Sequence, residues 1–389
     1  MNKPKMEVVK ETPMRIPLFH PYLSDAAKKA ATDVLDTKFI GQGAKIQEFE
    51  IEFGKKFRAD YAISTNSCTS ALQLAYRLAE FKKGDKVLVP LMTCSATIHP
   101  LLIQGATPVF VDIKEDFTVD PEDIRRKMDK DVKGIVVMHY GGTMCDMDSI
   151  MDIAKEYNVP VIEDTAQAVG AFYNGEKVQG YAGTIGDFGC FSFQAIKYMT
   201  TIDGGMLTVK DPDLYEKGKR IRWFGIDRDL KIKKGWEQFQ DWKTRKMTYD
   251  VTEIGYKFHM NDFNAAMGMV GLRELDEVLE HYQKLFFTYK DCLKDVDGVK
   301  FLPTKRGDTH WLMTVLLDDR DGIAKKLRDK GVETNVVHIR SDVYSLFKPF
   351  VNGDTYPNTD AIELKYLCLP IHMHITEDQV KEICNIIKK

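Results

Sequence analysis

Long apolar runs are missing from this sequence, and so is any excess of charge of one sign. Polar residues interrupt the apolar ones throughout, so no stretch approaches the roughly 18 apolar residues of a membrane-spanning helix. The amino-terminal residues contain no apolar core of the kind that a secretory signal has. The 55 Lys and Arg residues face 58 Asp and Glu residues, which leaves a net charge of -3 and no basic field for a nucleic acid or an anionic membrane. We therefore expect a cytoplasmic protein without nucleic-acid or membrane partners.

Cysteine is sparse and unpatterned. The 7 cysteines are scattered singly, without the CxxC spacing of zinc knuckles or the spacing of a disulfide scaffold. His372 and His374 stand close together, but no constellation of cysteines or carboxylates accompanies them. We expect reduced, mostly buried thiols and no metal site.

A glycine-rich dinucleotide turn is also absent. The turn after the first expected strand reads TNSCTS, whereas a nicotinamide-dependent dehydrogenase needs GxGxxG between that strand and its helix. The sequence thus disfavours a dehydrogenase. It does have 44% apolar residues in a chain of 389, which suffices for one large domain and a smaller one with a well-buried core.

Short β-rich runs alternate with helical patterns through the first part of the chain. Such alternation predicts a mostly parallel, doubly wound sheet. The expected strands are 61–64, 86–90, 109–112, 134–139, 159–164, 189–193 and 205–209, and the expected helices are 24–35, 46–57, 69–80 and 96–103.

The remainder predicts a smaller α+β unit. Its expected elements are a helix at 272–291, a strand at 311–317, and helices at 322–330 and 377–387. We place the boundary near Leu275, so that 1–275 holds an N-terminal segment and the large cofactor-binding domain, and 276–389 the small C-terminal domain. The segment 228–246, rich in Lys, Trp and Gln, is most simply a solvated charged loop, and the alternative is a loop that contacts substrate or a second subunit.

Small hydroxylated residues separate the first expected strand from its helix. Ser67, Cys68 and Thr69 stand at that helix start, where free backbone N–H groups and hydroxyls bind phosphate. Serine and threonine are also ordinary helix caps. By itself, the turn is therefore compatible with a phosphate site or with a capped helix.

Asp164 ends an apolar strand, at the edge where open α/β sheets bind their ligands. A carboxylate at this edge can pair with a protonated pyridine nitrogen and make that ring an electron sink. Capping of the following helix is the alternative role.

Lys197 follows a short expected strand in a setting of apolar and small residues. Burial there would lower the pKa of its amine and make it a nucleophile, whereas a lone lysine is otherwise a surface charge. Ser192, slightly earlier in the same stretch, could add a hydroxyl to the phosphate site.

In this order the stretches resemble the DegT/DnrJ/EryC1/StrS family of sugar aminotransferases, within the fold type I class of pyridoxal-phosphate enzymes. The resemblance runs from about Arg15 to the C-terminus, and its most specific strings are EDTAQAVGA, GDFGCFSFQAIKYMTTIDGG and GYKFHMNDFNAAMG. It implies an α/β fold with a mixed, mostly parallel seven-stranded sheet flanked by helices, plus a smaller C-terminal α+β domain.

The resemblance also implies roles for individual residues. Lys197 becomes the Schiff-base lysine, Asp164 binds the pyridine nitrogen, and Gln167 lies against the ring or its phenolic oxygen. The phosphate is surrounded by Ser67, Thr69 and Ser192. A homodimer with both active sites at the interface is implied as well.

Three positions depart from the family pattern. Cys68 replaces the usual Gly before the phosphate-binding Thr, and a side chain is less free to adopt a positive φ. The stretch where many members place an aromatic on the cofactor ring offers only Thr93 and Cys94. Lys257 replaces an Asn that the neighbouring subunit often contributes to the phosphate, and it would offer a full positive charge instead. We keep Cys68, Thr93 and Lys257 as cofactor-binding candidates.

The C-terminal unit supplies candidates for substrate binding. His310, His338 and Arg340 lie where family members approach substrate, and Arg340 offers a bidentate fork for a carboxylate or phosphate. A surface ion pair is the alternative for Arg340.

The implied reaction is a transamination in two halves. Glutamate gives its amino group and leaves pyridoxamine phosphate as intermediate, and a nucleotide-linked keto-deoxy sugar accepts the group to become an amino sugar for polysaccharide or glycan synthesis. Family members that aminate a cyclitol ketone or a small phosphorylated ketone remain the alternative. Lys197 favours transamination over dehydration, because the dehydratases of the family carry His at that position. A non-catalytic module would normally lose Lys197 or Asp164, and both are present.

Overall fold

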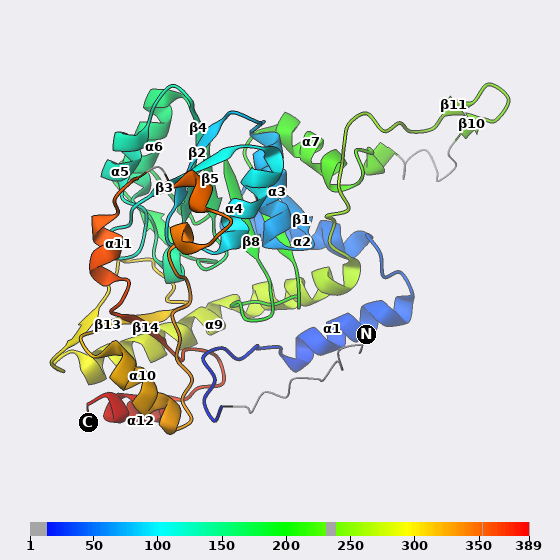
Figure 1. The fold of residues 1–389 in the computed structure, drawn as a ribbon. Helices are drawn as coiled ribbons and strands as arrows, with labels where there is room; N and C mark the ends of the chain where they lie inside the picture. Colours follow the sequence, from blue (N-terminus) through cyan, green and yellow to red (C-terminus); the bar gives the residue numbers. More distant parts are fainter. Residues whose placement is uncertain (1–13, 231–238, 352, 389) are drawn as a thin grey trace, which may run out of the picture.

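A seven-stranded sheet forms the centre of the computed structural model, which describes residues 14–230, 239–351 and 353–388 (Figure 1). The strand order is β1-β9-β8-β5-β4-β2-β3, and all neighbouring pairs are parallel except those that involve β9. The predicted mixed, mostly parallel sheet is confirmed. Its strands are β1 (Tyr61–Thr65), β2 (Lys86–Pro90), β3 (Thr107–Val111), β4 (Val132–Met138), β5 (Val161–Asp164), β8 (Phe188–Ser192) and β9 (Gly205–Val209).

Both faces of the sheet are buried, because apolar residues continue along each strand instead of alternating with polar ones. In β2, Val87 and Val89 pack in one core with α3 and α4, while Leu88 packs in another with α5 and α6. Near β8, Phe191 belongs to a third core that includes α2 and α9. The helices of the large domain are α3 (Cys68–Leu78), α4 (Ser95–Gln104), α5 (Pro121–Lys127), α6 (Met147–Tyr157) and α7 (Pro212–Arg222).

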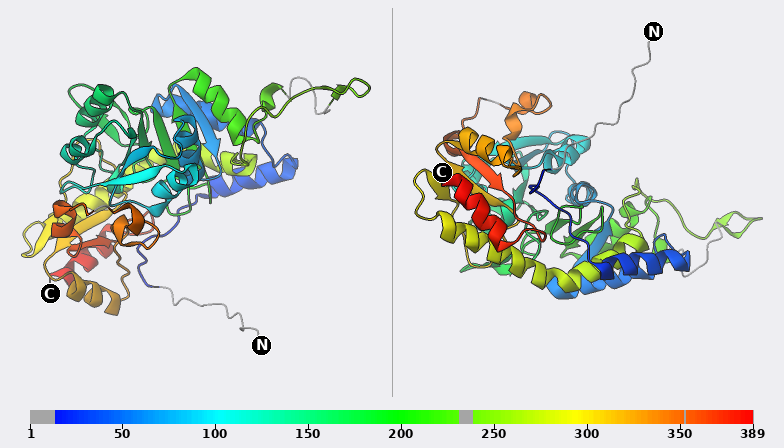
Figure 2. Two further views of the ribbon diagram at one scale, coloured as in Figure 1. Left: turned by 45° about the horizontal axis from the view of Figure 1, so that its top comes forward. Right: turned by 90° about the horizontal axis from the view of Figure 1, so that it is seen from below.

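Three helices run along one side of the molecule: α1 (Asp25–Thr37), α2 (Ala44–Phe57) and α9 (Asp262–Leu293) (Figure 2). The longest is α9, with 32 residues, and it begins at an N-cap in which the Asn261 side chain accepts from the Asn264 amide. This helix contacts α1 and α2 at one end and α12 of the small domain further along. The predicted domain boundary near Leu275 lies inside α9, so one helix is shared by the two proposed domains.

The small C-terminal unit is built on a three-stranded antiparallel sheet of β12 (Val299–Phe301), β13 (Met313–Leu317) and β14 (Tyr366–Leu369). Its helices are α10 (Arg320–Asp329), α11 (Pro357–Ile362) and α12 (Glu377–Ile387). A capping box formed by Thr376 and Gln379 starts α12. The predicted small α+β unit is thus present.

The remaining elements are short. The strands β6 (Phe172–Asn174) and β7 (Gln179–Tyr181) pair with each other, and 3-10 turns cover Tyr140–Gly142, Ser341–Val343 and Lys348–Phe350. The strands β10 (Phe239–Asp241) and β11 (Lys246–Met247) form a hairpin that projects from the body of the molecule (Figures 1 and 2). The segment 228–246, predicted as a loop, contains this hairpin except for Met247, and its residues 231–238 lie outside the described part. Throughout the described ranges, each helix is too short or too polar to cross a membrane.

Candidate active site

The ends of three strands bring the predicted site residues to one edge of the sheet. Asp164 ends β5 and Ser192 ends the neighbouring β8. Both Ser192 and Thr65, the last residue of β1, are paired in register with Gly205 of β9. The turn after β1 and the loop after β8 therefore leave the sheet at the carboxyl ends of parallel strands, where α/β proteins bind ligands.

The turn after β1 presents a helix N-terminus to this edge. Ser67 is the N-cap of α3, and its hydroxyl accepts from the Ser70 amide at 3.1 Å. The backbone N–H groups of Cys68 and Thr69 belong to the first helical turn, where no helical carbonyl is available to them. The Thr69 side chain is exposed beside them. The turn is thus both a capped helix start and a potential anion site, so the two sequence interpretations are compatible.

Cys68 does not need the freedom of a glycine. It is the first residue of α3 and is not among the described residues with positive φ, so a side chain is accommodated without strain. Burial raises the pKa of its thiol well above the usual range. The close approach is made by Gly205 instead, where a Cβ atom would lie 2.5 Å from the Ser67 carbonyl carbon and 2.7 Å from the Cys68 nitrogen.

Asp164 is buried at the floor of the site. Its Oδ2 accepts from the Thr97 hydroxyl at 2.7 Å, and its Oδ1 accepts from the Ala166 amide at 3.1 Å. Burial raises the pKa of the carboxyl, and the two hydrogen bonds oppose that shift. Across the described chain, no Lys, Arg or His forms an ion pair with Asp164. A buried carboxylate without a cationic partner is suited to a ligand that brings a positive charge.

Lys197 lies in the loop after β8 with its amine over the indole ring of Trp311, 3.6 Å from the ring centroid. Burial lowers the pKa of the amine to about 8, while the Asp164 carboxylate acts in the opposite direction. An amine with this pKa is substantially neutral in mildly alkaline solution, as a nucleophile or a base must be.

Gln167 and His338 form a polar pair beside Lys197. The Gln167 Oε1 atom accepts from the Gly141 amide at 2.7 Å, which turns its Nε2 toward the Nε2 of His338. Burial, followed by the nearby Lys197 charge, lowers the pKa of His338 to about 3. His338 is therefore a neutral imidazole that accepts from Gln167 beside Lys197, and its role in substrate binding stays a prediction.

The stretch expected to face the cofactor ring divides between core and surface. Thr93 is buried, with its hydroxyl 2.8 Å from the Thr97 hydroxyl, so it supports Asp164 from behind. Cys94, the N-cap of α4, is exposed and interacts electrostatically with Lys197. Ser192 is buried at the end of β8, and its hydroxyl accepts from the Gln194 amide at 3.4 Å.

Lys257 lies next to the phosphate turn of its own chain. The Asn66 side chain donates to the Lys257 carbonyl at 3.3 Å, and the Asn66 amide donates to the Phe258 carbonyl at 2.7 Å. The Lys257 side chain is exposed. Its backbone is thus held beside Ser67 without a second subunit.

Two predicted substrate residues have other partners in this structure. His310 is buried and stacked on Phe286, with ring centroids 3.8 Å apart, and it is the adjacent Trp311 that faces Lys197. The Arg340 guanidinium binds both oxygens of Asp342 at 2.7 Å and one of Asp360 at 2.5 Å. The guanidinium N–H groups of Arg340 are therefore already bound to carboxylates, which is the ion-pair role given above as the alternative to substrate binding.

The histidine pair near the C-terminus is occupied by backbone groups. His372 Nε2 lies 3.1 Å from the Pro17 carbonyl, and His374 Nε2 lies 3.1 Å from the Pro21 carbonyl. The two side chains fasten the N-terminal segment to the small unit.

Sequence reasoning missed two supports of the site. Thr97, inside a helix that the sequence does predict, donates the hydrogen bond to Asp164 described above. Glu163 is fully buried on the opposite face of β5, where it accepts from the amides of Gly183, Ile185 and Gly186 and from His139 Nε2 at 2.8 Å. The signal for Glu163 was a carboxylate inside an apolar strand, which requires buried donors.

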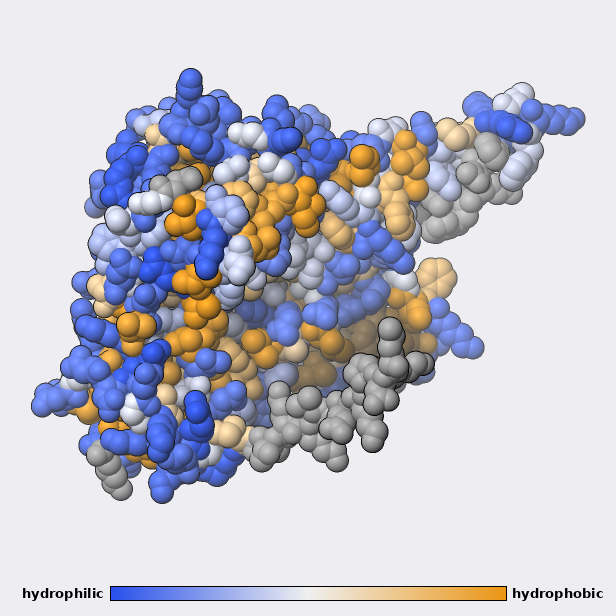
Figure 3. Space-filling view, in the orientation of Figure 1, coloured by the Kyte–Doolittle hydropathy of each residue, from blue (hydrophilic) through white to orange (hydrophobic). Residues whose placement is uncertain are grey.

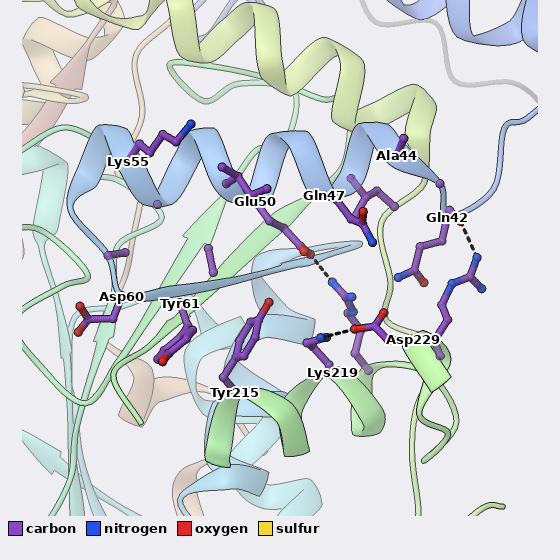
Figure 4. A pocket seen from close by; sticks show the side chains of 18 of the residues that line it. Gln42, Ala44, Gln47, Glu50, Lys55, Asp60, Tyr61, Tyr215, Lys219 and Asp229 are labelled. Carbon is purple, nitrogen blue, oxygen red and sulfur yellow. Dashed lines mark hydrogen bonds and ion pairs between the residues drawn. The ribbon is translucent and has the colours of Figure 1, made fainter. Parts of the chain in front are cut away.

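A cavity of about 860 Å³ lies elsewhere, between α2, β1 and α7 (Figure 4). Charged side chains pair with each other across it, Glu50 with Arg222 at 2.5 Å and Lys219 with Asp229 at 2.5 Å. Neither Lys197 nor Asp164 lines this cavity, so it is separate from the candidate active site.

Comparisons with known proteins agree with the resemblance. The profile of the DegT/DnrJ/EryC1/StrS aminotransferase family matches residues 21–388. A GDP-perosamine synthase of Vibrio cholerae is 28% identical over 96% of this chain and 98% of its own length. The spore coat polysaccharide biosynthesis protein SpsC of Bacillus subtilis is 29% identical over 96% of each chain. The PLP-form structure of the putative sugar aminotransferase Spr1654 of Streptococcus pneumoniae superimposes with a TM-score of 0.85 at 25% identity, covering 96% of this chain and 97% of that one.

Proposed function

Because the chain belongs to the DegT/DnrJ/EryC1/StrS aminotransferase family, we propose that it moves an amino group from glutamate to the keto group of a nucleotide-linked keto-deoxy sugar. The protein is a pyridoxal-phosphate-dependent aminotransferase. One observation carries the proposal. Lys197, a buried amine with a lowered pKa, lies near Asp164, a buried carboxylate without an ion-pair partner among the described residues, and the N-terminus of α3 lies beside them.

The residues present fit this cofactor at three points. The first turn of α3, with Ser67 and Thr69, and the hydroxyl of Ser192 would hold the phosphate, because Gly205 lets that turn pack directly on the sheet. Asp164 would hold the pyridine nitrogen in its protonated form. When bound in this way, pyridoxal phosphate supplies an electron sink for the pair of electrons left on a substrate carbon.

Lys197 has two tasks in the proposed mechanism. With the cofactor bound, its neutral amine would be the nucleophile that holds it, and the same amine, once free, would take the proton from the donor's α-carbon. In the second half-reaction its ammonium form returns a proton to the former keto carbon. A pKa of about 8 lets the same nitrogen accept and return the proton without a large energy difference.

The choice of a sugar nucleotide as acceptor is supported by the relatives. One similar protein is named for the synthesis of GDP-perosamine and another for spore coat polysaccharide. His338, a neutral imidazole whose Nε2 accepts from Gln167, carries its hydrogen on Nδ1, a donor that suits a sugar hydroxyl. A cyclitol ketone or a small phosphorylated ketone is the alternative acceptor within the same family. Rates with a panel of keto-sugar nucleotides, keto-cyclitols and phosphorylated ketones, with glutamate as donor, distinguish them.

We also propose a homodimer with shared active sites. Figure 3 shows apolar surface at the base of the projecting hairpin. The exposed large apolar side chains include Phe39 at 76%, Ile254 at 76%, Val251 at 58% and Ile202 at 51% exposure. Ile202 lies in the same loop as Lys197, so a subunit that covered Ile202 would also border the site. Light scattering of the purified protein should give twice the 44.5 kDa chain mass, and a monomer at working concentration would contradict the proposal.

A cytoplasmic location is supported by the thiols. All seven cysteines are free, including the exposed Cys94, which is the state expected in a reducing compartment.

An absorption spectrum tests the central proposal. The purified protein should show a band at the edge of the visible range that bleaches on addition of glutamate, and Lys197→Ala should lack that band. The matched control is Lys133→Ala, which removes an exposed lysine of β4 and should keep the wild-type spectrum. A cofactor-reconstituted wild type without the band would refute the role of Lys197.

A further inference from the structure

The segment that precedes β13 is fastened to the loop that carries Lys197. Tyr198 donates its hydroxyl hydrogen to the Thr309 carbonyl, and the indole N–H of Trp311 donates to the Ile196 carbonyl at 3.2 Å. The residues on both sides of Lys197 are therefore bonded to the small unit. This brings the face of Trp311 to the amine.

The backbone of this segment is bent to achieve that contact. His310 has a φ of 57°, in the left-handed region that side chains other than Gly disfavour. Its ring is buried flat against Phe286, and the Thr309 and Leu312 amides donate to the Gly142 and Gly141 carbonyls at 3.1 and 3.3 Å. A strained residue held this firmly indicates that the position of the next side chain, Trp311, matters.

Trp311 is a rigid aromatic surface. Only 2% of the residue is exposed, and its ring stacks on Phe19 of the N-terminal segment with centroids 5.3 Å apart. The Lys197 nitrogen lies 3.6 Å from the indole centroid, close enough for a strong attraction between an ammonium and the ring face. Tryptophan is the best aromatic partner for such a cation, and exclusion of water strengthens the contact.

We propose that Trp311 is the binding surface for the protonated Lys197 amine, and that it thereby takes part in the proton transfer of transamination. The inference rests on the proposed role of Lys197 as the base of the reaction. The amine would accept a proton from the donor's α-carbon, and the C–H electron pair would pass to the electron sink that the bound cofactor supplies. The resulting ammonium would lie on the indole until it gives the proton to the cofactor carbon that bears the transferred nitrogen. No oxidant, reductant or further reactant is needed.

The ring acts among several ionisable neighbours of the amine. Burial disfavours the ammonium and Asp164 favours it. Burial raises the pKa of the Cys68 thiol and lowers the pKa of His338, so both groups are uncharged where the amine titrates. Cys94 also lies near the amine. The indole has no charge to titrate, so its contribution is the same at every pH. Removing the ring should therefore shift the whole titration of the Lys197 amine toward lower pH without changing its shape.

The test measures this titration directly. The full-length protein is loaded with pyridoxamine phosphate, which leaves Lys197 free and needs neither donor nor acceptor. The amine is then labelled with trinitrobenzenesulfonate over a range of pH, and the Lys197 peptide is quantified by mass spectrometry. Trp311→Leu should lower the midpoint by about one pH unit. Trp311→Phe should lower it less, because a weaker ring remains, and Phe19→Leu, which changes the packing of Trp311 without touching the amine, should leave it unchanged.

An unchanged or raised midpoint in Trp311→Leu, with native circular dichroism, would overturn the inference. A Phe19→Leu shift as large as that of Trp311→Leu would overturn it as well. If Trp311→Leu does not fold, an unchanged midpoint in Trp311→Phe has the same force. Failure of the proposed function looks different, because Lys197→Ala would then keep the visible absorption band whatever the labelling midpoints are.

Discussion

At the scale of single residues, the site depends on one carboxylate that is costly to bury. Asp164 has a pKa raised by burial, so the folded protein holds its proton more tightly than the unfolded chain does. Stability from this group is therefore highest at low pH and is lost as pH rises through the folded pKa. The residue lowers stability at neutral pH in return for a charge at the cofactor position.

Asp164→Asn should separate these two effects. We expect kcat to fall by about 100-fold or more, because a neutral amide cannot keep a pyridine nitrogen protonated. The cofactor-free variant should unfold at an equal or higher temperature than the wild type at pH 7, since a buried charge is removed. Steady-state kinetics and calorimetry are the two measurements. A variant that kept wild-type kcat would remove Asp164 from the mechanism.

Thr97→Val should show how far the carboxylate depends on its buried hydroxyl partner. The change deletes the 2.7 Å hydrogen bond to Oδ2 with little change in volume, which costs about 1 to 3 kcal/mol when the partner is charged and buried. We expect a roughly tenfold or greater loss of kcat and a further rise in the Asp164 pKa, seen as an upward shift of the acid limb of the pH–rate profile. Thr97→Ser retains the hydroxyl and should restore both values; equal losses in Val and Ser variants would point to packing alone.

At the scale of elements, the phosphate turn depends on the close approach of β9. Gly205 lets the strand pass within contact distance of the Ser67 and Cys68 backbone. Any side chain at this position has to push α3 away from the sheet. The backbone amides at the N-terminus of α3 would then move with the helix.

Gly205→Ala should therefore weaken cofactor binding. With the added Cβ only 2.5 Å from backbone atoms, we expect a rise of tenfold or more in the Kd for pyridoxal phosphate, measured by titration of the cofactor-free protein. Gly41→Ala is the control, because a Cβ there meets nothing within 4 Å. A Gly205→Ala protein that bound cofactor like the wild type would show that the turn does not hold the phosphate.

Local patterns predicted the strands of the main sheet well, but they placed the start of α9 ten residues too late and gave no sign of β12 or β14. Apolar runs located all seven strands of the main sheet, because a buried parallel sheet needs continuous apolar residues. The strand ends then indicated Asp164 and the loop of Lys197. Thr97 was hidden because a threonine within a helix is indistinguishable from many others until the fold places an acid next to it. Trp311 and Lys197 are 114 positions apart in the sequence, so no local pattern shows that they meet. Histidine is the more usual site residue, and we therefore predicted His310 and not its neighbour Trp311.

At the scale of the whole molecule, stability at low pH should depend on Glu163. Burial would raise the pKa of this carboxyl, but its bonds to His139 and to backbone amides lower it below the usual value. A group with a lowered pKa contributes stability above its unfolded pKa of 4.5, and that stability is lost as pH falls through the folded pKa.

Glu163→Gln should be strongly destabilising at pH 7. Its amide NH2 group would face N–H donors that now point at a carboxylate, and we expect a loss of about 3 kcal/mol in the free energy of unfolding. Urea titration measures the loss, which should shrink at acid pH where the wild-type carboxylate is protonated. Glu122→Gln, an exposed residue of α5, is the control and should change stability little. A pH-independent loss would mean that packing rather than charge is at stake.

The unbroken helix α9 limits how the enzyme can open. Because it extends from α1 and α2 to α12, the two units are connected by a continuous helix instead of a flexible linker. A continuous helix offers no single residue at which a large change of φ and ψ could be absorbed, so any opening must be spread over its length as a gentle curve. The acceptor then has to fit the two units as α9 holds them, so the side chains around Lys197, more than a closing movement, would select which ketone is aminated.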